Sequence, residues 1–244
     1  SADGLMNIAE LVNGGKSNIN ITLDTDIDLT GKDWTPIGTD YDNSYKGTFD
    51  GGGHTITGLT FTTNDEFAGL FGWLNRAGTV KNVVMEGVQI TSNQIYGGSI
   101  GGVVGYSWGT IENCSVSGSV SGTVYVGGVV GAQIGGSITG CSSSATVKGT
   151  VDVGGVAGQT NSSATLTACY ATGNVTIEIA PKKNIAGGGL VGMNAGSSLL
   201  ACYATGNVTS TGSSTGYVHI GGFLGDNYIT VTACYWKNNH EQGI

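Results

Sequence analysis

Four aspartates near the N-terminus have the residue type and spacing of a calcium site. Asp24, Asp26 and Asp28 alternate with apolar residues, and Asp50 follows in the next predicted strand. Successive side chains on one face of a strand are about 7 Å apart, and calcium prefers several oxygen ligands. The alternative is a solvated acidic face that discourages pairing at an exposed edge. These four residues are the candidate metal ligands, and no other cofactor is indicated.

Four aromatic residues are the candidate ligand-binding residues. Trp73, Tyr106, Trp108 and Tyr228 follow copies of one Gly-rich phrase, in equivalent loops of different coils. Aromatic rings with polar neighbours suit stacking on sugar rings or anchoring a protein partner. The row is interrupted where the intervening copies are followed by Ala132, Gln159 and Met193.

Catalysis requires clustered charged groups, and the central part of the chain is poor in them. Glycoside hydrolysis needs two carboxyl groups about 5–9 Å apart. Between Ser99 and Thr230 the charged residues are only Glu112, Lys148, Asp152, Glu178, Lys182, Lys183 and Asp226. This wide spread favours a non-catalytic protein. The alternative is a polysaccharide lyase or hydrolase acting near residues 1–66, where eleven of the seventeen acidic residues lie.

The Gly-rich phrase occurs six times and must position all these residues. Its closing glycines are Gly72, Gly105, Gly131, Gly158, Gly192 and Gly225, which are 33, 26, 27, 34 and 33 residues apart. Repetition at such a period is typical of a solenoid. We expect three short strands per coil, sharp corners where glycine adopts positive φ, and an inward-pointing apolar residue between the glycines. The longer coils are expected to carry their extra residues in loops such as 179–185 and 210–217.

Five cysteines recur with the coils. Cys114, Cys141, Cys169, Cys202 and Cys234 are 27, 28, 33 and 32 residues apart and contain no C-x2-C pair, which argues against metal binding. Neighbouring coils are about 4.8 Å apart, so a disulfide is geometrically arguable, but the number is odd. We expect free, buried cysteines at the centre of a strand, which behave as small apolar residues.

The N-terminal part reads as a cap followed by the first strands. Apolar residues at helical spacing predict a capping helix over 1–15. Period-two alternation predicts a single half-buried strand over 18–29. We therefore divide the chain into this helix, initial β-helix coils over 16–66, and repeat coils of one continuous domain over 67–244.

Two of the repeats carry a resemblance to a known family. The segments 188–194 (GGLVGMN) and 201–208 (ACYATGNV) resemble the GLUG motif of repeat proteins from gut-type Gram-negative bacteria. The segments 34–38 and 47–56 resemble the N-terminal coils of the same proteins. The resemblance implies a right-handed parallel β-helix, an all-β solenoid, in an adhesin-like surface protein without a catalytic motif.

Composition excludes several partners. The chain has a net charge of −8 and one arginine, Arg76, so it lacks the basic stripe that nucleic acid requires. No stretch of about 18 apolar residues is present to span a membrane. We expect a secreted or cell-surface monomer, anchored at the outer membrane in the second case. It would bind a glycan or a host or bacterial surface protein, with a purely structural stalk as a further alternative.

Overall fold

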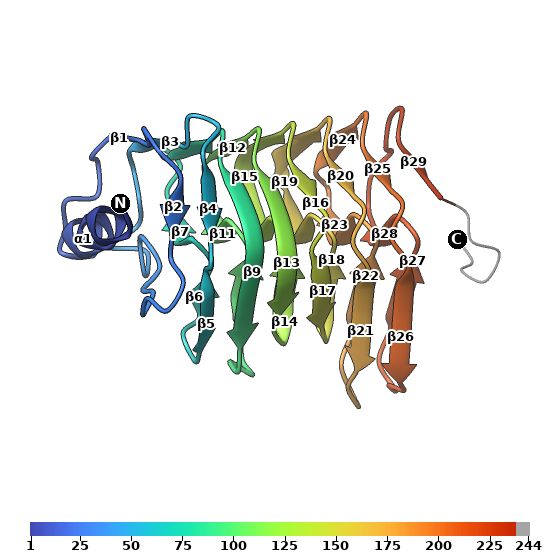
Figure 1. Ribbon diagram of the computed structural model, residues 1–244. Coiled ribbons are helices and arrows are strands. Elements are labelled where there is room, and N and C mark those ends of the chain that lie inside the picture. Colours follow the sequence, from blue (N-terminus) through green and yellow to red (C-terminus); the bar gives the residue numbers. More distant parts are fainter. Residues whose placement is uncertain (238–244) are drawn as a thin grey trace.

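The chain folds as a parallel β-helix capped by one α-helix, which confirms the predicted fold class. The computed structural model describes residues 1–237, without the side chain of Ser162. Helix α1 (Ala2–Asn13) lies across the N-terminal end, and the strands run from it in successive coils (Figure 1). All paired strands are parallel, so backbone hydrogen bonds join each coil to the next.

The described strands form three sheets, which we name A, B and C. Sheet A has eleven strands: β1 (Ile21–Thr22), β3 (Thr48–Asp50), β7 (Phe71–Leu74), β8 (Thr79–Lys81), β11 (Val104–Ser107), β12 (Thr110–Glu112), β15 (Val130–Thr139), β19 (Ala157–Thr167), β23 (Val191–Ala195), β24 (Ser198–Leu200) and β28 (Leu224–Asn227). Sheet B has twelve: β2 (Ile27–Asp28), β4 (Thr55–Thr57), β5 (Thr60–Thr63), β9 (Val84–Ser92), β13 (Ser115–Ser121), β16 (Ser142–Ser143), β17 (Thr146–Gly149), β20 (Tyr170–Ala171), β21 (Val175–Ile179), β25 (Tyr203–Ala204), β26 (Val208–Gly212) and β29 (Tyr235–Trp236). Sheet C has six: β6 (Phe67–Ala68), β10 (Ser99–Gly101), β14 (Val124–Gly127), β18 (Val151–Gly154), β22 (Ile185–Gly188) and β27 (Val218–Gly221).

The long coils differ from the short ones between sheets B and C. Strand β17 is followed almost directly by β18, whereas residues 180–184 separate β21 from β22 and residues 213–217 separate β26 from β27. These are the two loops in which the sequence predicted the extra residues.

Close approach of two backbones, rather than positive φ, explains the Gly-rich phrase. None of the glycines in the phrase Gly154–Gly158 has positive φ, which corrects the expectation for these corners. A Cβ on Gly158 would lie 2.5 Å from the Val126 nitrogen in the preceding coil, and a Cβ on Gly154 would lie 2.6 Å from the Gly192 nitrogen in the next. The first and closing glycines therefore let sheets A and C meet through their outer faces, without intervening side chains.

The second glycine of the phrase faces the core. A Cβ on Gly155 would lie 2.6 Å from the Ala171 side chain on the opposite sheet B. The residue that follows points inward as predicted and is buried in five successive coils: Val103, Val129, Val156, Leu190 and Phe223. The phrase is thus a packing motif: its first and closing glycines contact the backbone between sheets A and C, and its second glycine contacts the core.

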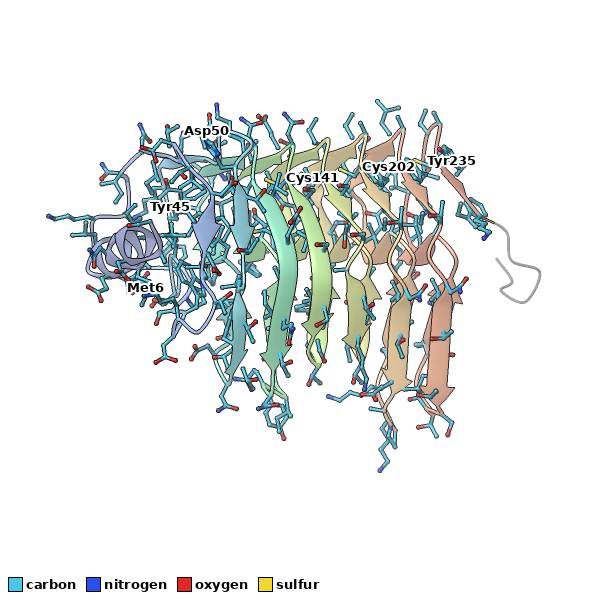
Figure 2. All side chains as sticks on the ribbon, viewed as in Figure 1. Met6, Tyr45, Asp50, Cys141, Cys202 and Tyr235 are labelled. Carbon is cyan, nitrogen blue, oxygen red and sulfur yellow. The ribbon has the colours of Figure 1, made fainter. Side chains whose placement is uncertain are left out.

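The cysteines lie at corners, not at strand centres. Cys114 stands between β12 and β13, and the residue before each cysteine has positive φ, as Asn113 has (50°). Figure 2 shows Cys141 and Cys202 along one edge of the solenoid. Each thiol contacts the carbonyl two residues earlier (Cys114 Sγ to Glu112 O, 3.2 Å), so the side chain closes its own turn. All five cysteines are free, and all but the half-buried Cys234 are buried.

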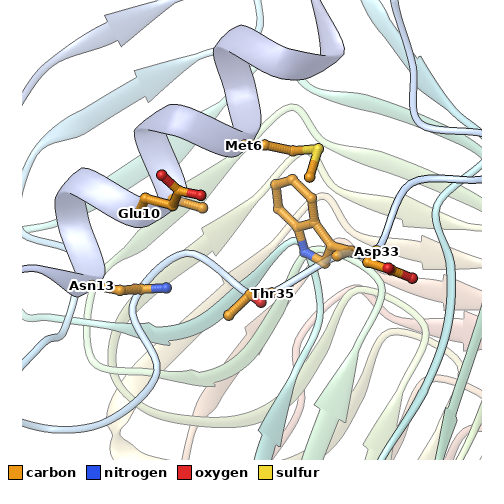
Figure 3. Close-up of a pocket in the computed structure, with 7 residues that line it drawn as sticks. Met6, Glu10, Asn13, Asp33 and Thr35 are labelled. Atoms are coloured by element: carbon orange, nitrogen blue, oxygen red, sulfur yellow. The ribbon is translucent and has the colours of Figure 1, made fainter.

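Helix α1 is joined to the first coil by hydrogen bonds as well as by apolar contacts. Leu5, Ala9 and Val12 are buried against the solenoid, which confirms the predicted capping helix. Asn13 Nδ2 donates to Pro36 O (3.0 Å), and Asn13 Oδ1 accepts from the Gly38 nitrogen (2.8 Å). Figure 3 shows the resulting shallow cleft, with Asn13 beside the segment that contains Asp33 and Thr35. The cleft is the seam between the cap and the first coil.

Candidate functional site

Two columns of outward-facing residues flank the glycine contact between sheets A and C. The residue after each closing glycine forms column 1, in the register Trp73, Tyr106, Ala132, Gln159, Met193 and Asp226. The residue two positions before each phrase, or one position before the first copy, forms column 2, in the register Phe67, Ser99, Tyr125, Asp152, Ala186 and His219. Because only glycine backbone separates them, the columns are the walls of a groove that runs along the solenoid.

Aromatic rings fill the N-terminal end of this groove. The Trp73 and Tyr106 ring centroids are 4.3 Å apart, and Phe67 packs edge-on against Trp73 at 4.7 Å. Arg76 lies over the Trp108 ring with its Cζ 5.3 Å from the centroid. The structure therefore brings three of the four predicted aromatic residues together, but neighbouring groups already cover their faces.

Tyr228, the fourth predicted residue, lies four coils away from Trp108, about 19 Å along the axis at 4.8 Å per coil. It is exposed and belongs to the open part of the groove, which has a volume of about 510 Å³. The lining residues are Tyr125, Val151, Asp152, Gln159, Asn184, Ile185, Ala186, Met193, Tyr217, His219, Asp226 and Tyr228. Asn184 and Tyr217 come from the long loops, and the Asn184 side chain accepts a hydrogen bond from the Tyr217 nitrogen.

Asp152 is a buried carboxyl group in the wall of the groove. Only 6% of the residue is exposed, and no hydrogen-bond donor within residues 1–237 reaches its carboxylate. Burial, with a smaller contribution from the negative charge of Asp226, raises the pKa of Asp152 from 3.8 to about 7. A buried charge without a partner is costly, so this carboxyl group is partly protonated near neutral pH.

Asp226 stands on the other wall, two coils further along the axis than Asp152, and has partners of its own. Its Oδ2 lies 3.3 Å from His219 Nδ1 and accepts a hydrogen bond from the Tyr228 hydroxyl at 3.1 Å. That hydrogen bond, together with the charge of Asp226, raises the pKa of Tyr228. The groove thus holds two carboxyl groups, one imidazole and three tyrosines.

Sequence reasoning missed this cluster because it measured distance along the chain. Asp152 and Asp226 are 74 positions apart, yet each stands beside a copy of the same phrase. Asp152 and His219 both precede their phrase by two residues, and Asp226 directly follows one. Aligning the coils on their glycines would have placed all three in one groove, which corrects the expectation that widely spread charges leave the repeat faces without a cluster.

The predicted acidic face does not form. The segment 18–29 is not one strand: β1 and β2 belong to sheets A and B, and a corner separates them at Asp24 and Asp26. Asp26 contacts His54 (3.3 Å), and Asp50 contacts Lys81 (3.2 Å). The Oδ1 atom of Asp28 accepts a hydrogen bond from the Thr30 nitrogen. Within residues 1–237 no three His, Cys, Asp or Glu side chains are grouped so that they could hold a metal ion.

A ladder of tyrosines lies on the outer face of sheet B, and it was not predicted from the sequence. Tyr170, Tyr203 and Tyr235 are in register, with ring centroids 4.8 and 5.1 Å apart and planes within 6° of parallel. Each ring covers the face of the next, so the stacked faces are not available to a ligand. The recurring Ala-Cys-Tyr triplet was the signal for this ladder.

Comparison with protein families matches the central coils. The model of the family described as "The GLUG motif" matches residues 96–121 and 122–148. The chain contains GLUG motifs. The two matched motifs end before Gly154 and cover the coils that carry Tyr106 and Tyr125, so the open part of the groove is built mainly by the coils that follow them.

Two proteins are similar to part of this GLUG-containing chain. Halomucin of Haloquadratum walsbyi is 39% identical over 102 residues, which are 41% of this chain and 1% of halomucin. A protein of Evansella cellulosilytica described as "Putative Gly-rich membrane protein" is 37% identical over 100 residues, or 37% of this chain and 11% of that protein. The chain therefore spans only a small part of these relatives. The gut-type Gram-negative source implied by the resemblance stays a prediction.

A solved structure shares the fold. The protein described as "a putative immunoglobulin A1 protease from Bacteroides ovatus" matches with a TM-score of 0.74 over 96% of this chain and 73% of that chain. The two sequences are 21% identical, so the match shows the architecture alone. Within residues 1–237 no helix is long and apolar enough to cross a lipid bilayer.

Proposed function

We propose that this chain is a non-catalytic binding module of a secreted or cell-surface protein and that it recognises a glycan in the open part of the groove. The names of halomucin and of the Gly-rich membrane protein support a surface or extracellular location. Their much greater lengths support a module within a longer protein.

The composition of the groove walls is the main support for this proposal. Its walls offer three tyrosines together with the polar groups of Gln159 and Asn184, the combination that suits a sugar with apolar faces and hydroxyl edges. The walls stand on paired strands of successive coils, so binding orders few residues and loses little conformational entropy. Tyr228 is the predicted anchor that lies here, while Trp73, Tyr106 and Trp108 close the other end.

Replacing Tyr228 with alanine is expected to weaken glycan binding by about tenfold or more, because an exposed aromatic anchor typically contributes over 1 kcal/mol. The measurement is an array of immobilised glycans and matrix proteins probed with the wild-type chain and the variant. Tyr96→Ala is the matched control, since Tyr96 is at least as exposed as Tyr228 but lies outside the groove.

The array distinguishes the alternatives. Glycan binding that Tyr228→Ala abolishes and Tyr96→Ala preserves supports the proposal. Binding only to proteins would show that the partner is a protein and not a glycan. Equal binding by both variants would contradict the groove as the binding site. An array without any bound target would favour a structural stalk.

A second candidate function, glycoside hydrolysis, is favoured by one observation. Asp152 and Asp226 stand on opposite walls of the groove, two coils apart, and the first has a pKa raised to about 7, as a general acid requires. Asp226, however, already accepts hydrogen bonds from Tyr228 and from the Asn227 nitrogen. We expect bound glycans to be recovered uncut, and shortened products in their mass spectra would instead identify an enzyme.

A further inference from the structure

The charges in the groove indicate which glycans it would take. Within residues 1–237, Asp152 shares the groove with one other acid and one base, both two coils further along: Asp226 on β28 and His219 on β27. Tyr125 and Tyr228 complete its surroundings. No lysine or arginine is among the described residues that line this part of the groove. The site is therefore acidic and lacks a fixed positive charge.

The burial of Asp152 without a hydrogen-bond donor indicates that this part of the groove binds a ligand. The residue is more than nine-tenths buried and lines the groove, and no hydrogen-bond donor within residues 1–237 reaches its carboxylate. Buried charged groups are normally paired. A positively charged group in the groove would supply both the hydrogen bond and the countercharge, and it would relieve the repulsion from Asp226.

The other walls suit the same ligand. Tyr125, Tyr217 and Tyr228 line the groove together with Met193. Aromatic faces attract organic cations through the negative charge on their π-systems, and such cages are the usual receptors for ammonium groups. Acidic and aromatic walls together discriminate against anionic ligands and favour cationic ones.

We propose that the groove binds an organic ammonium group carried by a glycan, as in an amino sugar, against the carboxylate of Asp152, with the negative charge of Asp226 two coils further along adding to the attraction. This inference rests on the proposed glycan-binding function and narrows its ligand class. Tyrosine rings flank the ammonium group, and the amide nitrogen of Asn184 and the amide oxygen of Gln159 are available to the sugar hydroxyls, because their other polar atoms contact Tyr217 and Met193. His219 Nδ1 lies 3.3 Å from Asp226 Oδ2, so the imidazole occupies part of that carboxylate and leaves Asp152 as the main acceptor.

The test compares two oligosaccharides of equal length near neutral pH by isothermal titration calorimetry: a glucosamine oligomer with free amines, and its fully N-acetylated counterpart. We expect the amine form to bind at least about tenfold more tightly, because acetylation removes the charge. Asp152→Asn should reduce this preference by about tenfold, and Asp226→Asn should reduce it less, because Asp226 lies two coils away and already contacts His219 and Tyr228. Glu86→Gln, which removes an exposed charge from sheet B, should leave it unchanged.

The outcomes separate this inference from the proposed function. Equal affinity for the two oligomers, or a preference that survives both aspartate variants, overturns the ammonium site while glycan binding stands. If neutral glycans bind on the array and neither oligomer binds, the ammonium site is likewise overturned and glycan binding stands. Failure of every glycan to bind overturns both. A lysine-rich peptide that binds while both oligomers fail would assign the ammonium group to a protein and contradict a glycan source.

Discussion

Gly158→Ala is expected to lower the free energy of unfolding by about 3 kcal/mol or more, the range of severe overpacking. The added Cβ would lie 2.5 Å from the Val126 nitrogen and 2.6 Å from the Tyr125 carbonyl carbon. Both atoms belong to paired backbone that cannot move without breaking the hydrogen bonds between coils. The measurement is chemical denaturation of both proteins, followed by circular dichroism.

Gly4→Ala is the control with the opposite sign. Gly4 lies in helix α1, and a Cβ there would meet only the Ser1 hydroxyl, at 3.3 Å. Alanine is the better helix former, so this variant should gain up to about 1 kcal/mol. If Gly158→Ala proved as stable as the wild type, close contact between sheets A and C would not be the reason for the repeated phrase.

Asp152→Asn is expected to stabilise the protein at alkaline pH by about 2–4 kcal/mol. The pKa of Asp152 is raised from 3.8 in the unfolded chain to about 7 in the folded protein. Between these two pH values the folded state binds more protons than the unfolded state, so wild-type stability falls as the pH rises. Asparagine has a similar shape and does not ionise, so the variant lacks this loss.

The measurement is the free energy of unfolding of both proteins at about pH 4 and pH 8. The difference should be small at the lower pH, where Asp152 is protonated in the folded protein, and should reach its full value at the higher pH. Asp226→Asn should give a smaller gain, because it removes only the repulsion and leaves Asp152 buried. A variant that is less stable than the wild type at both pH values would show that a donor satisfies the Asp152 carboxylate.

The periodic features of the fold could be predicted from the sequence. Recurring glycines fixed the coil period, and the apolar residue between them was correctly placed in the core, as Val129 shows. Corners were harder to predict because the alternation of inward-facing apolar residues continues through them without a break. Ile21 and Ile27 both face the core, yet they lie in different sheets, so a single strand was predicted across the corner.

The candidate site could be predicted only in part. Column 1 follows from the repeat alone, because equivalent positions in successive coils must align. Column 2 and the proximity of the two walls depend on how sheets A and C approach each other, which glycine backbone contacts determine. The raised pKa of Asp152 could not be foreseen, since it arises from burial and from Asp226, a residue two coils further along the solenoid.

Oxidative footprinting with and without a bound glycan tests the central claim, that the open groove is the binding site, most directly. Met193 and Tyr228 line the groove, whereas Met6 lies half-buried in the cleft beside helix α1. We expect the saturating glycan to slow oxidation of Met193 and Tyr228 several-fold and to leave Met6 unchanged, as detected by mass spectrometry of peptides. Unchanged oxidation of Met193 and Tyr228 at saturation, or protection of the sheet B tyrosines instead, would contradict the account.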